Sequence, residues 1–132
     1  MMELDQFTLD EANALVPWLQ EKLKGLDRNR EEYVTLQERF NEIIHDATRD
    51  GSKDDPELIQ TAANVKDLAA KIEDGVQEIL DRGIIVRDVS TGLVDFPSQR
   101  DGREVFLCWI GGEEKIEFWH ETDRGFDYRE PL

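Results

Sequence analysis

Apolar residues in the first half of the chain recur at alternating spacings of four and three positions. The series begins after Thr8 and Glu11, whose spacing matches a capping box, in which each side chain binds the other residue's backbone amide. Such a spacing places apolar side chains along one stripe of a helix, and we predict a helix over residues 9–48 with a heptad seam. The seam positions are Ala12, Val16, Leu19, Leu23, Leu26, Arg30, Tyr33, Gln37, Phe40, Ile44 and Ala47.

A second apolar series follows a polar segment over 46–56, which we interpret as a loop. Asp55 can accept a hydrogen bond from a helical amide. Proline is favoured at the first position of a helix, where Pro56 would lie, and glycine just after the last position, where Gly83 would lie. We therefore predict a helix over 56–82 that pairs antiparallel with the first and leaves residues 9–25 to cover a sheet. Its seam positions are Leu58, Ala62, Val65, Ala69, Ile72, Val76 and Ile79.

After Gly83 the pattern changes to short β-branched and aromatic runs with a period of two. Asp101-Gly102 and Gly111-Gly112 are turn dipeptides, and Pro97 is expected to stop the strand that precedes it. We predict four antiparallel strands in a meander, with one face under the helices. The strands are expected at 84–86, 93–96, 104–110 and 115–121.

These elements predict an α+β fold, in which a long antiparallel helical hairpin precedes a small antiparallel β-sheet of about four strands. A length of 132 residues suits one domain with its own core. We expect a single domain over 1–132, with the helical hairpin at 1–83, the β-meander at 84–121 and a polar tail at 122–132 packed on the domain.

The chain is strongly acidic, with a formal net charge of −15 at pH 7. Such a surface repels phosphate backbones and anionic lipid head groups, which argues against nucleic-acid and membrane binding. No apolar run approaches the roughly 20 residues that span a bilayer, and the acidic N-terminus lacks a signal pattern. The single cysteine, Cys108, fits a reducing compartment, so we expect a cytoplasmic protein.

Several short motifs spread over most of the chain are shared with one known family. The chain resembles the uncharacterised domain-of-unknown-function family 2203, whose members have no assigned activity. The resemblance implies a small bacterial or archaeal cytoplasmic protein, and it labels no residue as catalytic. The motifs are FTLDEAN at 7–13, GLVDFP at 92–97, DGREV at 101–105, CW at 108–109, WHE at 119–121, GF at 125–126 and PL at 131–132.

Three side chains near the predicted sheet rim are candidate metal ligands: Asp95, His120 and Asp123. A neutral imidazole and two carboxylates can hold a divalent cation, although a histidine at such a rim is more often a hydrogen-bonded structural group. Cys108 is a further metal-ligating residue type. A short loop centred on Gly112 and Glu113 would turn Cys108 to the opposite face from His120, so we expect a small buried hydrophobe there. A joint Cys108–His120 site would require a bulge or another register.

The β half carries five arginines, of which Arg103 and Arg129 are candidates for binding a small ligand. Ion pairing with nearby aspartates is the favoured alternative, because a guanidinium binds a carboxylate through two parallel hydrogen bonds.

The sequence indicates no reaction, since it lacks an H-E-x-x-H zinc motif, a G-x-S-x-G elbow and a phosphate-binding glycine loop. Our leading hypothesis is a non-catalytic interaction or assembly module, a homodimer built on the helical seams or a partner of another protein. The alternative is a protein that binds a divalent metal or small ligand around Asp95, His120 and Asp123, with enzymatic activity left open.

Overall fold

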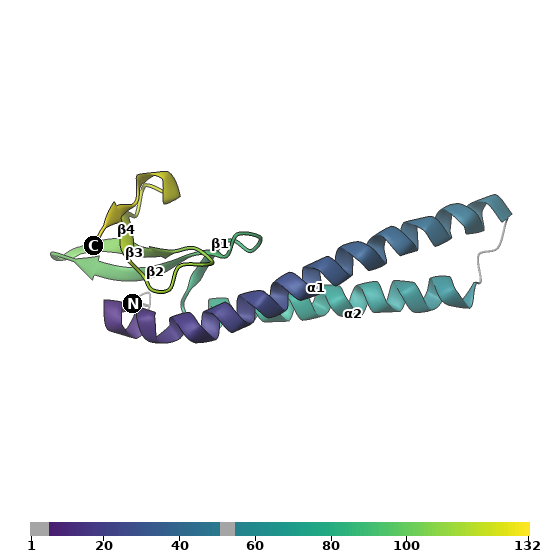
Figure 1. Cartoon of the computed structure of the whole chain (residues 1–132), viewed down its shortest axis with the longest axis horizontal. Coiled ribbons are helices and arrows are strands. Elements are labelled where there is room, and N and C mark those ends of the chain that lie inside the picture. The colour runs from purple at the N-terminus through teal and green to yellow at the C-terminus, as the bar shows by residue number, and fades with distance from the viewer. Residues whose placement is uncertain (1–5, 51–54) are drawn as a thin grey trace, which may run out of the picture. The chain divides into compact units, whose positions relative to one another are not determined.

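The computed structural model describes residues 6–50 and 55–132, which form two helices followed by an antiparallel sheet (Figure 1). This arrangement confirms the predicted α+β fold. No helix among the described residues is both long and apolar enough to cross a membrane. In chain order the elements are α1 (Leu9–Asp50), α2 (Pro56–Asp81), β1 (Ile85–Asp88), β2 (Leu93–Arg100), β3 (Arg103–Trp109), β4 (Phe118–Glu121), the 3-10 helix η1 (Phe126–Tyr128) and β5 (Glu130–Pro131).

The chain divides into two compact units. One unit, called here the sheet unit, comprises Met1–Lys24 and Val76–Leu132, and the other, the hairpin unit, comprises Gly25–Gly75. Both helices contribute residues to both units, whereas every strand belongs to the sheet unit.

The predicted capping signals lie at both helix starts and just after α2. The Thr8 hydroxyl accepts a hydrogen bond from the Glu11 amide at 3.1 Å, and Glu11 Oε1 accepts one from the Thr8 amide at 2.9 Å. The hydrogen bond from the Thr8 amide lowers the pKa of Glu11. Asp55 Oδ1 accepts from the amide of Glu57 at the start of α2, at 2.9 Å. Gly83 follows α2 with a φ of 85°, a backbone conformation that favours glycine.

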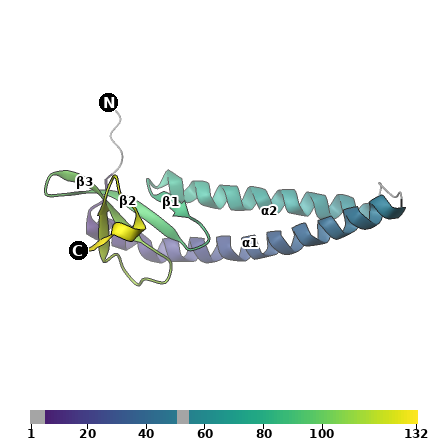
Figure 2. The same cartoon turned by 90° about the horizontal axis from the view of Figure 1, so that it is seen from above.

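In the hairpin unit the two helices run side by side in opposite directions (Figure 2). Gly75 permits a close approach, because a Cβ there would lie 2.6 Å from Leu26 Cδ2. Outside residues 47–54, the buried side chains of this unit are Leu26, Ile43, Thr61 and Leu68.

Two seam positions differ from the prediction, because Ile43 rather than Ile44, and Thr61 rather than Ala62, is buried. Each pair is adjacent, and either member lies three or four residues from the seam positions on both sides of it, so a spacing of three or four alone could not choose between them.

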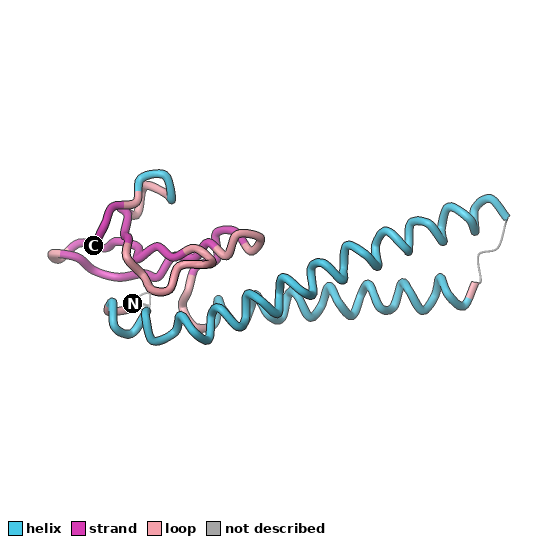
Figure 3. Tube along the Cα trace, in the orientation of Figure 1, coloured by secondary structure: helices cyan, strands magenta, loops and turns pink. Residues whose placement is uncertain are grey.

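The strands, magenta in Figure 3, form one sheet. It has five strands in the order β1-β2-β3-β4-β5, each antiparallel to its neighbours. The meander is therefore close to the prediction, and the extra strand comes from the tail, where Glu130 and Pro131 pair with β4. The Asp101-Gly102 turn joins β2 to β3 with both φ angles positive, 54° and 79°, as the turn dipeptide predicts.

Pro97 does not end its strand, contrary to our expectation, since β2 continues to Arg100. The carbonyl of Pro97 accepts a hydrogen bond from the Phe7 amide at 2.7 Å, so the backbone groups of this residue point away from β3. The missing N–H therefore removes no hydrogen bond between β2 and β3.

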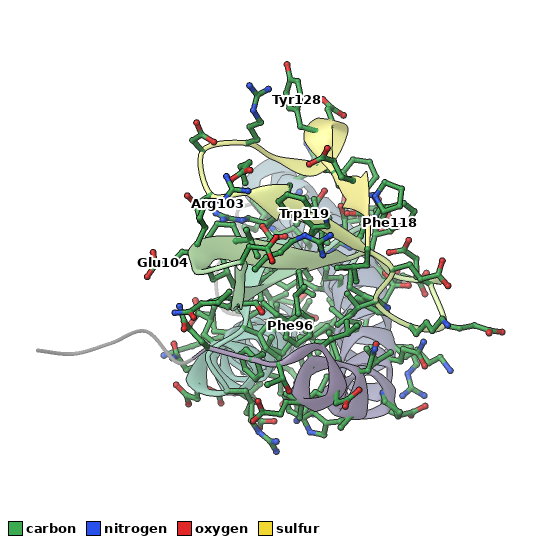
Figure 4. The ribbon with its side chains drawn as sticks, turned by 90° about the vertical axis from the view of Figure 1, so that its left-hand side faces the viewer. Phe96, Arg103, Glu104, Phe118, Trp119 and Tyr128 are labelled. Atoms are coloured by element: carbon green, nitrogen blue, oxygen red, sulfur yellow. The ribbon has the colours of Figure 1, made fainter. Side chains whose placement is uncertain are left out.

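One face of the sheet packs against the first turns of α1, which belong to the same unit (Figure 1). Phe7 meets Phe96 edge to face, with ring centroids 5.3 Å apart, and Asn13 Oδ1 accepts from the Ile116 amide at 2.7 Å. Phe96 projects toward the helices, and Tyr128 of η1 lies on the other side of the sheet (Figure 4). The side chains buried on the helix-facing side include Val94, Phe96, Val105, Leu107, Trp109 and Trp119.

Candidate metal centre

Three polar side chains lie buried next to one another on the sheet face that points away from α1. Asp95 in β2, Cys108 in β3 and His120 in β4 are 2%, 0% and 1% exposed. Asp95 and Cys108 are direct cross-strand partners, and His120 pairs with Phe106, two residues before Cys108. Residues two apart on a strand share a face. One ligand atom from each of the three side chains lies within 4.8 Å of the others.

This pairing corrects the register expected for the hairpin of β3 and β4. The expected loop would pair Val105 with His120, whereas Val105 pairs with Glu121. A shift of one residue turns a side chain to the opposite face of the sheet. The prediction that Cys108 and His120 point to opposite faces is therefore wrong, and the two residues share a site without any bulge between them.

Tertiary contacts explain why a short turn was the wrong assumption for this loop. Ile116 is buried, and its amide donates to Asn13 in α1. The carbonyl of Glu113 accepts from Trp109 Nε1 at 3.0 Å and from Gln20 Nε2 at 3.2 Å. These contacts hold the loop against helix α1, so the ladder between β3 and β4 ends before the glycine turn.

Asp95 is the centre of a chain of hydrogen bonds. Its Oδ1 lies 2.9 Å from His120 Nε2, and its Oδ2 accepts from Arg87 Nε at 2.9 Å. His120 Nδ1 lies 2.8 Å from the carbonyl oxygen of Glu121. A carbonyl can only accept, so Nδ1 carries a proton and donates it, and one further proton lies between His120 Nε2 and Asp95 Oδ1. The carbonyl thus fixes the orientation of the ring and directs Nε2 toward Asp95.

Cys108 is a buried thiol rather than an activated nucleophile. Burial, followed by the nearby Asp95 carboxylate, raises the pKa of the Cys108 thiol to about 11. Both nitrogens of His120 already have partners, so no imidazole nitrogen is left to take the thiol proton. Arg129 Nη1 lies 4.0 Å from Cys108 Sγ, too far to stabilise a thiolate strongly. The arrangement does not support thiol catalysis.

A pocket of about 410 Å³ opens beside the three buried side chains. Asp123 lines this pocket together with Asp95 and His120, so the three candidate metal ligands named from the sequence share one pocket. Asp123 is exposed and is not a member of the mutually close set, whose third member is Cys108. The pocket lining also includes Arg87 and Arg124.

The two arginines named from the sequence are engaged in ion pairs with glutamates. Arg103 pairs with Glu121 at 2.9 Å and is 59% exposed. Arg129 binds both carboxylate oxygens of Glu113, at 3.1 and 3.0 Å. Neither arginine lines the pocket, in which Arg87 and Arg124 are the cationic side chains. Arg87 lies two residues after Ile85, the residue that pairs with Asp95, and so reaches the Asp95 carboxylate from the neighbouring strand.

The donor set of sulfur, imidazole nitrogen and carboxylate oxygen is suited to a transition metal ion of borderline softness, above all Zn²⁺. A tetrahedral zinc ion holds such donors roughly 3–4 Å apart, which agrees with separations within 4.8 Å. The His120–Asp95 contact of 2.9 Å would have to open by a few tenths of an ångström to admit the ion. The outer hydrogen bonds from His120 to a carbonyl and from Arg87 to Asp95 are of the kind that orient metal ligands.

The sequence of this α+β protein places it in a defined family. The chain is a member of the family described as "Uncharacterized conserved protein (DUF2203)", whose model matches residues 6–132. This match confirms the resemblance that the short motifs indicated. No curated protein and no solved structure matches the chain.

Proposed function

We propose that the protein binds a divalent transition metal ion, with zinc as the preferred ion, through Asp95, Cys108 and His120. The proposal rests on one observation, namely three buried donor atoms of different chemistry within 4.8 Å of one another. It modifies the ligand set expected from the sequence, because Cys108 replaces Asp123 as the third ligand. Three protein ligands leave a fourth tetrahedral position for water or a substrate, as in catalytic zinc sites.

The competing interpretation is a purely structural hydrogen-bond network. Asp95, His120 and Arg87 already satisfy one another, and no buried side-chain nitrogen or oxygen among the described residues lacks a partner. Cys108 separates the two interpretations, because a structural network makes little use of the thiol whereas a metal ion binds it as the thiolate. The decisive measurement must therefore report on sulfur.

We expect chelator-treated protein to bind one Co²⁺ ion and to develop the near-ultraviolet charge-transfer band of a cobalt–thiolate bond. Zn²⁺ should displace the cobalt and raise the melting temperature, since an ion at 100 times its Kd stabilises the folded state by about 2.7 kcal/mol. Binding should be weaker at pH 6 than at pH 8. The metal must displace the proton of Cys108, whose pKa is raised to about 11, and lower pH favours that proton.

Two variants and one control define the site. Cys108→Ala should abolish the thiolate band, and His120→Ala should weaken binding by more than about 100-fold, since losing even an outer-shell partner typically costs 10–100-fold. His45→Ala is the matched control, because His45 is the other histidine of the chain and is exposed on α1 in the hairpin unit. Wild-type protein that shows neither a thiolate band nor a metal-dependent melting shift would disprove the proposal without reliance on any variant.

We infer as a second candidate function that the helical hairpin assembles with another copy of the chain. Support comes from seam residues that the two helices leave half-buried, namely Tyr33, Phe40, Val65 and Ile72. A second hairpin could cover these side chains in a four-helix bundle. Light scattering should then give the mass of a dimer at micromolar concentration, and Phe40→Glu should shift it to that of a monomer. A monomeric wild type at high micromolar concentration would contradict this proposal.

A further inference from the structure

We propose that the pocket beside the metal centre binds a small ligand through an anionic oxygen, a carboxylate or a phosphate. The oxygen would take the fourth metal position and pair with Arg124 and Arg87. This inference rests on the proposed metal site and names the class of ligand that the same site accepts.

The first argument concerns the charge of the pocket. The lining contains the carboxylates Asp95 and Asp123 and the guanidinium groups Arg87 and Arg124. A dication bound by the Cys108 thiolate and Asp95 is neutralised by them. Two arginines then remain against the single carboxylate of Asp123, which leaves an excess of one positive charge. In a chain whose net charge is −15, this pocket favours an anion.

The second argument concerns donors that other groups of the protein do not use. Within residues 6–50 and 55–132, no carboxylate forms an ion pair with Arg124, whose guanidinium lies 4.8 Å from the ring centroid of Tyr128. Arg87 gives Nε to Asp95, and its side chain is 44% exposed. Among the described residues, the ion pair and the hydrogen bond of this guanidinium both use Nε, and neither uses a terminal nitrogen. Guanidinium groups bind carboxylate or phosphate through parallel hydrogen bonds.

The third argument concerns size and the rest of the wall. A volume of about 410 Å³ lies in the range of small-molecule sites. Leu93 and Phe126 add apolar surface to the lining, and Gly125 adds backbone without a side chain. A ligand with a short carbon skeleton can therefore contact the apolar wall while its anionic end lies against the metal and the arginines. The pocket is too small for a folded macromolecular partner.

The test uses the Co²⁺ form of the full chain, with inorganic phosphate and acetate as separate probes and sodium chloride at matched ionic strength as the control. We expect phosphate, acetate or both to change the visible cobalt bands saturably, and the probe that binds more tightly identifies the class of oxyanion. Arg124→Gln should weaken this binding at least about tenfold, the loss expected for a hydrogen bond to a charged group. Arg28→Gln, an exposed arginine of the hairpin unit, should leave it unchanged.

The outcomes separate this inference from the metal proposal. A cobalt–thiolate spectrum that neither probe changes would overturn the inference and leave the metal site intact. Equal anion binding by Arg124→Gln and wild type would overturn it as well, because the arginine would then have no part in recognition. A protein that binds no Co²⁺ would overturn both proposals.

Discussion

Asp95→Ala is expected to lower the free energy of unfolding by about 3–5 kcal/mol, the range for removing one partner of a buried charged pair. The Asp95 side chain is 3% exposed, and it accepts from Arg87 while it shares a proton with His120. Its loss leaves the His120 ring, 1% exposed, without the partner that Nε2 has in the wild type. Urea denaturation in the presence of a chelator measures this effect without any contribution from bound metal.

The matched control is an exposed ion pair at the start of β3. Arg103→Ala removes the 2.9 Å contact with Glu121, and the Arg103 side chain is 59% exposed, so we expect a loss below about 1 kcal/mol. Asp95→Asn should fall between the two, because the amide keeps the volume and one acceptor oxygen. An Asp95→Ala protein no less stable than Arg103→Ala would show that the Arg87–Asp95–His120 chain contributes little to folding.

The helices could be predicted from the sequence because their signals are local. Thr8 with Glu11, Asp55 with Pro56, and Gly83 each act within a few residues, and each caps a helix as predicted. The extra length of β2 beyond Pro97 could not be predicted, because it depends on which edge of the strand the proline faces. That edge is defined by a hydrogen bond from Phe7, far away in the sequence. The fifth strand likewise depends on a pairing of only two residues with β4.

The candidate site was predictable in composition and not in geometry. Asp95, His120 and Asp123 were grouped from the ends of neighbouring strands, and they do line one pocket. Cys108 was set aside because the sheet face to which its side chain points, relative to His120, depends on the parity (odd or even) of the number of residues in the loop after β3. That parity is decided by the buried Ile116 and its hydrogen bond to Asn13, a contact between the two ends of the chain. A periodic pattern within each strand contains no information about such a contact.

Arg129 holds the C-terminal tail to the same face of the sheet as the candidate metal centre. Its guanidinium binds both oxygens of Glu113, and it lies 4.1 Å from the ring centroid of Phe118 and 4.4 Å from that of Phe126. Glu113 in turn accepts a hydrogen bond from the amide of Ile110 at 2.9 Å. One side chain therefore connects the loop after β3, strand β4 and the helix η1, whose residue Phe126 forms part of the pocket wall.

Arg129→Gln should lower the free energy of unfolding by about 2–4 kcal/mol, since it removes a part-buried bidentate ion pair and two cation–π contacts. Arg129→Lys should give an intermediate loss, because an ammonium retains the charge but cannot bind both oxygens of Glu113 in the same way. Hydrogen exchange should locate the change in the tail, with faster exchange at the Leu132 amide, which donates to the carbonyl of Glu117 at 2.9 Å. The amides of β2 and β3 should respond only as far as global stability falls.

Arg124→Gln is the matched control for this effect, because Arg124 also belongs to the tail, but its guanidinium forms no ion pair within the described part of the chain and lies over the exposed Tyr128 ring, at 4.8 Å. We expect a stability change within about 0.5 kcal/mol for this surface substitution. The two arginines would then have separate roles, Arg129 in fixing the wall of the pocket and Arg124 in binding an anion within it. Equal losses from Arg129→Gln and Arg124→Gln would contradict the anchoring role of Arg129, because that role depends on the contacts with Glu113, Phe118 and Phe126 that Arg124 lacks.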